Sequence, residues 1–566
     1  MHIHEQGHFT EGVGELRDRR FNGQANLAVG RGTSRQAPSK FPRSLYTPAT
    51  AIAVIHPLAP VGHVIRAPRP MARNPYQPLP LELARQGRFL AITHVFRSPP
   101  SMEMNTSHYD AIVLGAGQGG GPLAGAFAKA GRRALLIERA YAGGTCVNEG
   151  CTPTKTMVAS ARVAYLAKRG PEYGVLPTAL HLDLERVRAR KRAIVAKFRQ
   201  GSENGLMRAG VEVRYGSGRF VAARTLDVLA ADGTVTRVSG DVVIISTGLR
   251  NARPEIPGLD SVDTLDNASI MELDRVPRHL IVLGAGYVGV EFAQMFRRFG
   301  SRVTILCKAT QVLPREDADI AESLLEILRG DGIEAHLGCN TRSVETGSDG
   351  GLRVHVSVGD ATLSIEGSHL LVATGRRPNT DDIGTDRAGV ALDDRGFVVV
   401  SPSLETSAPG VYAMGDVKGG PAFTHIAYDD FRILRTNLLQ EGHATITGRV
   451  LPYTVFTDPQ LGRVGLSERD ARAAGLNFRV VSIPMRHVAR AIEMDETRGF
   501  MKAIVDVPTK RLLGAAVLGV EGGELASILQ VAMMGNLPYT ALRDAVFSHP
   551  TMSESLNNLF ASLNLE

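Results

Sequence analysis

Two of the four cysteines of this chain stand five positions apart, in the segment GGTCVNEGCTPTK. The four residues between Cys146 and Cys151 form a loop long enough to close a disulfide. The same loop is short enough to keep both sulfurs beside one ligand. This spacing predicts a redox-active pair that alternates between dithiol and disulfide.

The residues around Cys151 favour a reactive thiol. Thr152 can cap a helix that has Pro153 at its first position, and residues 156–168 have a helical pattern. Cys151 is therefore expected just before a helix N-terminus, where the helix dipole favours a thiolate. Lys155, one turn into the helix, adds a positive charge nearby.

Two other interpretations of the cysteine pair are weaker. A structural zinc site needs four ligands, usually from two CxxC pairs, and no second pair exists. An inert structural disulfide is typical of secreted proteins, and nothing marks this chain as secreted. We expect Cys307, at a strand end, and Cys339, in a loop region, to be plain small residues without a partner.

A dinucleotide-binding pattern precedes the cysteines. A glycine turn stands between a predicted strand and a predicted helix, and an acid ends the next strand. Small residues let the backbone approach a pyrophosphate, whose charge the helix start stabilises. The acid, 18 residues after the last glycine, can accept a hydrogen bond from an adenosine ribose hydroxyl. The parts are residues 109–114, Gly115, Gly117, Gly120, residues 122–130, residues 134–137 and Glu138.

The same pattern returns later in the chain, which points to a second nucleotide. It consists of residues 279–283, Gly284, Gly286, Gly289, a helix to Phe299 and residues 302–306. At the offset that gave Glu138 stands Cys307, followed by Lys308. An acid there would bind a free ribose 2′-hydroxyl and repel a 2′-phosphate. Its absence, with Lys308 and Arg315 nearby, favours NADPH, with NADH possible.

GTCVNEGCTPTK, placed after an FAD-type glycine turn, resembles the active-site signature of the class I pyridine nucleotide-disulfide oxidoreductases. The resemblance runs from about His108 to the C-terminus. It implies an α/β fold with two Rossmann-like domains, for FAD and NAD(P), and a C-terminal α+β dimerisation domain. It also implies a homodimer.

The resemblance assigns roles to individual residues. Cys146 would be the outer, interchange thiol, and Cys151 the inner thiol facing the flavin. Lys155 would lie near flavin N5 and pair with Glu291, and Tyr287 would cover the nicotinamide pocket. His549, oriented by Glu554, would be the acid/base that reaches Cys146 of the other subunit. Further cofactor-binding positions would be Gly144, Thr145, Thr247, Gly248, Gly375 and Asp416.

The electron acceptor is less defined. The C-terminal cysteine pair usual in mercuric reductases is absent, and His549, which those enzymes lack, is present. The stretches 497–506 and 549–560 look closest to the copper(II) reductases linked to reactive-chlorine resistance. We therefore expect a metal ion, Cu(II) or Hg(II), as acceptor. An organic disulfide reductase of the glutathione or dihydrolipoamide type is the alternative, and a flavin-bound redox sensor is the alternative outside enzymes.

Charge and composition separate a leader from the enzyme. The formal charge of +7 arises before residue 105, where 13 Lys and Arg stand against 6 Asp and Glu. The rest is neutral, which argues against nucleic acid as a partner. No apolar run is long enough to span a membrane, and we expect a cytoplasmic protein that binds no structural metal ion. The predicted ranges are 1–104 (disordered or mis-assigned leader), 105–257 and 381–447 (FAD domain), 258–380 (NAD(P) domain) and 448–566 (dimerisation domain).

Overall fold

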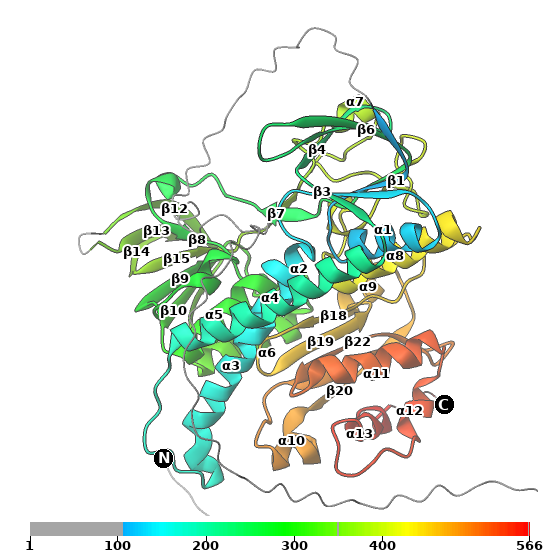
Figure 1. The fold of residues 1–566 in the computed structure, drawn as a ribbon. Coiled ribbons are helices and arrows are strands. Elements are labelled where there is room, and N and C mark those ends of the chain that lie inside the picture. Colours follow the sequence, from blue (N-terminus) through cyan, green and yellow to red (C-terminus); the bar gives the residue numbers. More distant parts are fainter. Residues whose placement is uncertain (1–105, 348–349, 564, 566) are drawn as a thin grey trace, which may run out of the picture. The chain divides into compact units, whose positions relative to one another are not determined.

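The computed structural model describes residues 106–347, 350–563 and 565. The predictions about the leader, residues 1–104, lie outside these residues. Within them, helices pack beside two largely parallel sheets and beside antiparallel sheets of two, three and five strands (Figure 1). No helix in this part of the chain combines the length and the apolar character that crossing a membrane requires.

The first sheet contains the first glycine turn. β1 runs parallel to β2 and β6. β17, which comes much later in the chain, pairs in parallel with β6. The strand order is β3-β2-β1-β6-β5-β4, with β17 beside β6. α1 (Gly120–Lys129) packs against β1 and β2, and begins two residues before the predicted helix. The strands are β1 (Ser107–Leu114), β2 (Ala134–Glu138), β3 (Glu212–Tyr215), β4 (Ser217–Ala222), β5 (Thr225–Leu229), β6 (Val235–Ile245) and β17 (Val411–Ala413).

The second sheet repeats this arrangement around the second glycine turn. Its order is β11-β10-β9-β15-β8, and all its strand pairs are parallel. Helix α5 (Tyr287–Phe299) follows the turn, and α6 (Ala318–Gly330) follows β10. The strands are β8 (Thr264–Leu265), β9 (His279–Leu283), β10 (Arg302–Cys307), β11 (Glu334–Leu337) and β15 (His369–Val372). A separate antiparallel sheet holds β12 (Cys339–Thr346), β13 (Leu352–Val358) and β14 (Ala361–Gly367).

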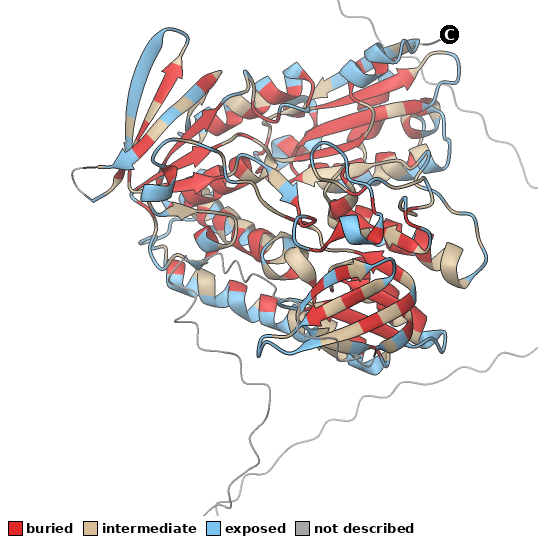
Figure 2. Cartoon of the chain, turned by 90° about the horizontal axis from the view of Figure 1, so that it is seen from above, coloured by how far each residue is buried: buried red, intermediate tan, exposed pale blue. Residues whose placement is uncertain are grey.

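The C-terminal sheet is antiparallel, with the order β18-β19-β22-β21-β20. Helix α11 (Gly522–Met534) packs on β19 and β22, and α13 (Ser555–Ala561) contacts β20 and β21. The strands are β18 (Pro452–Val455), β19 (Gln460–Gly465), β20 (Phe478–Pro484), β21 (Phe500–Asp506) and β22 (Leu512–Gly519). Buried residues concentrate on the strands of the sheets, as Figure 2 shows.

Two expectations about helices need correction. Helix α3 (Cys151–Arg169) begins at Cys151 itself, and the Thr152 side chain does not cap it; the residue before the helix is Gly150. The Lys- and Arg-rich sequence from Asp183 to about Arg208 predicts a helix with a solvated basic face. The observed helix is α4 (Leu184–Arg208), which is capped by Asp183. Its basic face is not simply solvated: Lys191 is buried, because it pairs with Glu272.

Candidate redox site

In each of the two glycine turns, the middle glycine has open space where a Cβ would stand, and the two outer glycines have backbone atoms there. A Cβ at Gly115 would lie 2.3 Å from the Ser246 carbonyl, and one at Gly120 would lie 2.1 Å from the Gly115 carbonyl. A Cβ at Gly117 would meet nothing within 4 Å. The outer glycines thus allow the tight turn and the close helix, while the middle one leaves space for a phosphate to approach the backbone. The turn fits the pyrophosphate of a dinucleotide.

The second turn has the same division. A Cβ at Gly284 would lie 2.4 Å from the Ala373 carbonyl, and one at Gly289 would lie 2.1 Å from the Gly284 carbonyl. A Cβ at Gly286 would again meet nothing within 4 Å. Cys307, the last residue of β10, is buried, while Lys308 and Arg315 in the following loop are exposed. This turn fits the pyrophosphate of a second dinucleotide.

Glu138 lies at the end of β2, where its carboxylate accepts hydrogen bonds from two backbone amides. The Ala116 N–H donates to it over 2.8 Å, and the Ala140 N–H over 2.8 Å. Glu138 therefore holds the glycine turn against the next loop. Its contact with an adenosine ribose stays a prediction.

The cysteine segment packs directly on the first glycine turn. Gly144 begins the short helix α2 (Gly144–Asn148) with a φ of +61°, and its ideal Cβ would lie 2.6 Å from Gly117 Cα. Only glycine tolerates both the left-handed backbone and this close approach. Thr145 and Cys146 follow in α2, half-buried. The segment therefore places the thiol of Cys146 near the first glycine turn.

Cys146 and Cys151 are both free thiols and lie within hydrogen-bonding reach of each other. The hydrogen bond from Cys146 lowers the pKa of Cys151 to about 5, and Thr424 and Lys155 act in the same direction against the effect of burial. The same hydrogen bond and burial raise the pKa of Cys146. The proton thus stays on Cys146, and Cys151 carries the negative charge.

Thr424, the first residue of α8 (Thr424–Leu439), has its hydroxyl 3.4 Å from Cys151 Sγ. The sequence from Thr424 to Arg435 predicts a helix whose start, by the family resemblance, would lie close to the flavin ring. It does not single out Thr424 as a partner of the thiol. Helix α8 therefore places a hydroxyl group beside the charged sulfur of Cys151.

Lys155 and Glu291 form an ion pair that joins α3 to α5. The Lys155 ammonium lies 2.7 Å from the Glu291 carboxylate, whose other oxygen accepts the Phe456 N–H over 2.9 Å. The Lys155 ammonium also lies 4.7 Å from the centre of the Phe456 ring. Tyr287, at the start of α5, packs against Phe423 with ring centres 5.9 Å apart. The first turns of two helices and the segment before β19 therefore meet beside Cys151.

The remaining predicted cofactor positions lie on the segments that return to the first sheet. The Thr247 hydroxyl donates to the Asn379 carbonyl over 2.8 Å, and the Asn379 N–H donates to the Gly248 carbonyl over 3.1 Å. Gly375 has a φ of +139°, and the space beside it is open. Asp416 lies 3.6 Å from Arg376, and burial raises the pKa of its carboxyl group. Contacts of these residues with a cofactor stay predictions.

Comparisons with known proteins decide the family. Residues 109–430 match the pyridine nucleotide-disulphide oxidoreductase family, and residues 451–560 match the dimerisation domain of the same family. This chain belongs to the pyridine nucleotide-disulfide oxidoreductases. It is therefore an FAD-dependent enzyme with a disulfide redox centre, and the predicted fold class, with two Rossmann-like domains and a dimerisation domain, is confirmed.

Individual relatives narrow the type of oxidoreductase. The chain is 41% identical over 458 residues to the probable pyridine nucleotide-disulfide oxidoreductase RclA of Escherichia coli, covering 80% of this chain and 99% of RclA. It is 34% identical to the mercuric reductase of Streptomyces lividans, covering 79% and 94%. The solved Cu(II) complex of the HOCl-induced flavoprotein disulfide reductase RclA matches with a TM-score of 0.74 and 39% identity, over 81% of this chain and all of that chain. The oxidoreductase is of the RclA and mercuric reductase type.

In this oxidoreductase, His549 and Glu554 lie together near the C-terminus. His549 Nδ1 is 2.8 Å from one carboxylate oxygen of Glu554 and 3.0 Å from the other. The His549 side chain is 69% exposed. A carboxylate at this distance fixes the ring orientation and leaves Nε2 available for proton transfer. Contact with a partner's Cys146 stays a prediction.

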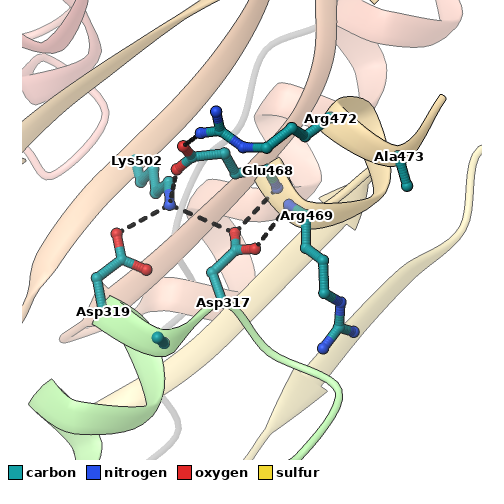
Figure 3. A pocket seen from close by; sticks show the side chains of 8 residues that line it. Asp317, Asp319, Glu468, Arg469, Arg472, Ala473 and Lys502 are labelled. Atoms are coloured by element: carbon teal, nitrogen blue, oxygen red, sulfur yellow. Dashed lines mark hydrogen bonds and ion pairs between the residues drawn. The ribbon is translucent and has the colours of Figure 1, made fainter. Parts of the chain in front are cut away.

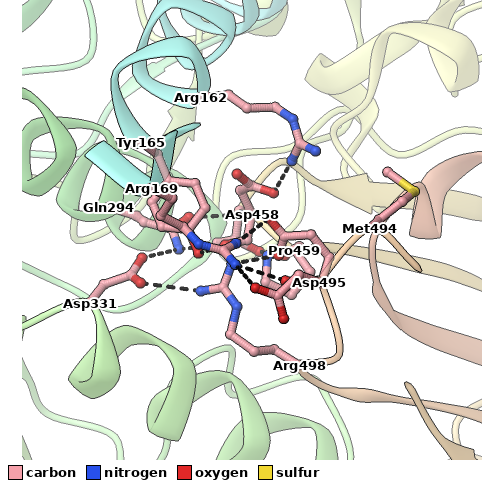
Figure 4. A network of polar contacts seen from close by, with 12 residues as sticks. Arg162, Tyr165, Arg169, Gln294, Asp331, Asp458, Pro459, Met494, Asp495 and Arg498 are labelled. Carbon is pink, nitrogen blue, oxygen red and sulfur yellow. Dashed lines mark hydrogen bonds and ion pairs between the residues drawn. The ribbon is translucent and has the colours of Figure 1, made fainter. Parts of the chain in front are cut away.

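A polar network that the sequence did not reveal joins the family's domains (Figure 4). Asp458, 6% exposed, forms ion pairs with Arg162 of α3 and Arg298 of α5. Tyr165 of α3 lies under the Arg298 guanidinium, 3.9 Å from ring centre to Cζ. Residues so far apart in sequence carry no local pattern that predicts their contact. The network ties together the same two helices that Lys155 and Glu291 join.

Cys307 and Cys339 are both free cysteines, and only the prediction that Cys339 lies in a loop region is wrong. Both are buried, and the Cys339 thiol donates to the His336 carbonyl over 3.2 Å and lies beside the backbone amide of Cys307. Burial raises the pKa of Cys339. Cys339 also begins β12, and so does not lie in a loop. Among the described residues, no group of three or more His, Cys, Asp or Glu is placed to hold a metal ion.

Proposed function

We propose that this oxidoreductase passes electrons from NADPH through FAD and the Cys146–Cys151 pair to a metal ion, with Cu(II) as the acceptor to test first and Hg(II) as the second. The observation that carries the proposal is the thiol pair itself, in which Cys151 has a lowered pKa beside Thr424 and Lys155. The solved Cu(II) complex of RclA, at 39% identity, supports copper as the metal.

Bound FAD would supply two-electron transfer between a nicotinamide nucleotide and the sulfur pair. Gly115, Gly117 and Gly120 would hold its pyrophosphate, and Asp416 its ribitol side. The chain's own thiols then act on the acceptor. Two Cu(II) ions each accept one electron from the reduced pair, in which Cys146 is the thiol and Cys151 the thiolate; the pair becomes the disulfide, the ions become Cu(I), and the one proton of Cys146 is released. His549, with Glu554 beside it, would take up the proton of Cys146.

The proposed preference for NADPH rests on the end of β10. The position equivalent to Glu138 holds Cys307, whose side chain is buried, and the exposed Lys308 follows it. Because this position has no carboxylate, no negative charge there repels a 2′-phosphate. The positive charge of Lys308 favours a 2′-phosphate. Turnover measured with both nucleotides tests the preference, and a large preference for NADH would refute it.

An acceptor panel tests the proposed function. Purified FAD-loaded enzyme is given NADPH with Cu(II), Hg(II), oxidised glutathione or lipoamide, and the loss of NADPH is followed. We expect Cu(II) to be reduced fastest. Cys146→Ala should abolish that reduction, while Cys339→Ala, which removes a buried thiol elsewhere, should leave it intact. Copper reduction that survives in Cys146→Ala would place the reaction away from the thiols and refute the proposal.

The same panel tests an organic disulfide as the acceptor. The contact between His549 and Glu554 favours this second candidate, because a thiol leaving group needs a proton donor. Faster turnover with lipoamide or oxidised glutathione than with Cu(II) would establish it. No NADPH oxidation with any acceptor would favour the third candidate, a flavin-bound redox sensor.

The assembly is part of the proposal. The match of residues 451–560 to a dimerisation domain supports a homodimer in which His549 of each subunit serves the other. The mass of the purified protein in solution tests this. The domain ranges 105–257, 258–380, 381–447 and 448–566, and a cytoplasmic location, stay predictions.

A further inference from the structure

The loop after β10 lies against the second glycine turn. We define it as residues 308–317; it begins at Lys308 and contains Arg315. In its middle, the Leu313 N–H donates to the Ala285 carbonyl over 2.8 Å, and Ala285 stands between Gly284 and Gly286. The loop that holds both candidate 2′-phosphate cations is thus in direct contact with the turn that fits the pyrophosphate.

The backbone of the loop is held in an unfavourable conformation. Leu313 has a φ of +45°, in the left-handed region that residues other than glycine rarely adopt. It is also buried and precedes Pro314. Such a conformation persists only when its surroundings impose it, and it is typical of ligand-binding segments. The contacts that impose it here come from two directions, the glycine turn and the C-terminal domain.

The base of the loop is anchored by buried charges of the C-terminal domain. Arg463 of β19 donates to Glu316 over 2.7 and 2.9 Å. Lys502 of β21, 3% exposed, lies 3.4 Å from Asp317. Asp317 also accepts the backbone N–H groups that begin α9 (Glu468–Ala473), as Figure 3 shows. These contacts are buried and belong to the packing of the two domains.

Arg469 of α9 reaches further along the loop than the anchors do. Its guanidinium donates to the Arg315 carbonyl over 2.9 Å and to the Pro314 carbonyl over 3.4 Å. Arg469 itself is exposed. Its side chain therefore contributes little to the buried anchor but fixes the backbone of the residue whose charge is a candidate for 2′-phosphate binding.

We propose that Arg469 is a positioning residue for selection of the nicotinamide nucleotide. By holding the Pro314 and Arg315 carbonyls, it keeps the 308–317 loop in the conformation that presents its positive charges to a 2′-phosphate. The C-terminal domain would thus set a property of the NAD(P) domain. This inference rests on the proposed preference for NADPH, and it adds a residue that touches no part of the nucleotide itself.

Binding of two nucleotide fragments to the FAD-loaded enzyme tests the proposal. Adenosine 2′,5′-bisphosphate carries the 2′-phosphate, and 5′-AMP lacks it, so the ratio of their dissociation constants isolates selection at this end. Arg469→Met keeps the aliphatic stem and removes the donors. We expect it to raise the dissociation constant of the bisphosphate about tenfold, since two hydrogen bonds that order the loop are lost, and to leave that of 5′-AMP unchanged.

Arg472→Met is the matched control. Arg472 lies on the same helix and pairs with Glu468, and its side chain is 71% exposed. Removing it deletes the same charge from α9 without touching the loop, so both dissociation constants should stay as in the wild type. Arg469→Lys, which keeps one donor group, should recover part of the selectivity. Equal changes for both fragments in Arg469→Met, or the same loss of selectivity in Arg472→Met, would overturn the proposal.

The outcome separates this inference from the proposed cofactor. If the wild-type enzyme binds the bisphosphate no better than 5′-AMP, the preference for NADPH fails. In that case, a change in the ratio of the two dissociation constants in Arg469→Met would still support the positioning role of Arg469. An unchanged ratio would overturn that role. The dissociation constants are measured by calorimetry, and the thermal unfolding midpoint is measured on the same samples, so a misfolded variant is recognised. If Arg469→Met is misfolded, the ratio of dissociation constants in Arg469→Lys tests the positioning role instead.

Discussion

The Lys155 ammonium lies 2.7 Å from the Glu291 carboxylate, and this contact joins the helix that begins with Cys151 to the helix that follows the second glycine turn. Glu291 is only 3% exposed, and its two carboxylate oxygens contact Lys155 and the Phe456 N–H. The ion pair therefore affects both the stability of the interface between the helices and the charge on Cys151.

Replacing Lys155 by Met should raise the pKa of Cys151, because a nearby positive charge that favours the thiolate is lost. We expect a rise of about one unit. The rate at which iodoacetamide alkylates Cys151 in the reduced enzyme follows the thiolate, so the midpoint of its pH dependence should move to higher pH. An unmoved midpoint would contradict the assigned role.

The Lys155→Met variant also leaves Glu291 buried and unpaired, which should lower the free energy of unfolding by about 3 kcal/mol. Lys155→Met with Glu291→Met removes both charges and should recover most of that loss in urea unfolding. The midpoint of alkylation in this double variant should lie between those of the wild type and Lys155→Met, because the Glu291 carboxylate raises the pKa of Cys151 by less than Lys155 lowers it. This comparison separates the electrostatic effect on the thiol from the loss of stability.

Thr424→Val should also raise the pKa of Cys151, because it removes the hydroxyl that lies 3.4 Å from the sulfur. A hydrogen bond to a charged group contributes about 1.5 kcal/mol, which corresponds to about one pKa unit. Thr424→Ser keeps the hydroxyl and should keep the alkylation midpoint. Equal midpoints in the Val and Ser variants would show that Thr424 does not act on the thiolate.

His549→Ala should lower the turnover number by about a hundredfold or more with an organic disulfide, because proton transfer is lost. Mixed dimers show whose thiol His549 serves. A subunit with Cys146→Ala paired with a subunit with His549→Ala regains one intact site only if His549 acts on the partner. Activity in the mixed dimer, measured after tandem-tag purification, is the expected result; an inactive mixed dimer would place His549 and Cys146 in the same subunit's site.

Asp458→Asn should destabilise the protein, because it leaves Arg162 and Arg298 without the buried carboxylate that they share. Breaking a buried pair from one side costs about 3–5 kcal/mol. Asp495→Asn removes a carboxylate that is 62% exposed and pairs with Arg169 at the surface, so it should cost less than about 1 kcal/mol. The free energies of unfolding in urea give both values, and equal losses would show that burial of Asp458 has no special effect.

Gly286→Ala should weaken NADPH binding about tenfold or more without unfolding the protein, because its Cβ would enter the open space of the second turn. Gly289→Ala should instead destabilise the fold, since its Cβ would lie 2.1 Å from the Gly284 carbonyl. Gly201→Ala in α4 has no neighbour within 4 Å and is the control for both. Thermal unfolding and NADPH titration separate the two effects, and unweakened NADPH binding by Gly286→Ala would contradict the fit.

The sequence by itself determined the parts of this protein that depend on local spacing. The two glycine turns, the cysteine pair and the strands and helices beside them follow from residues close together in the chain. Helix α3 differs from its prediction by the position of its first residue and by the lack of a Thr152 cap. The absence of an acid at Cys307 is also a local observation. Such features are set by backbone geometry within one βαβ unit, so the order of residues is enough to predict them.

Only the tertiary structure decided which distant groups meet. Lys155 and Glu291 stand 136 positions apart, and the family resemblance predicted their pairing. No local pattern in the sequence predicted three other contacts: Thr424 with Cys151, Asp458 with two arginines, and Arg469 with the 308–317 loop. Charged side chains such as Lys191 look solvated in the sequence and are paired in the fold. Burial makes an unpaired charge costly, and it is the packing of three domains, not the spacing of residues, that determines which charges are buried and what they contact.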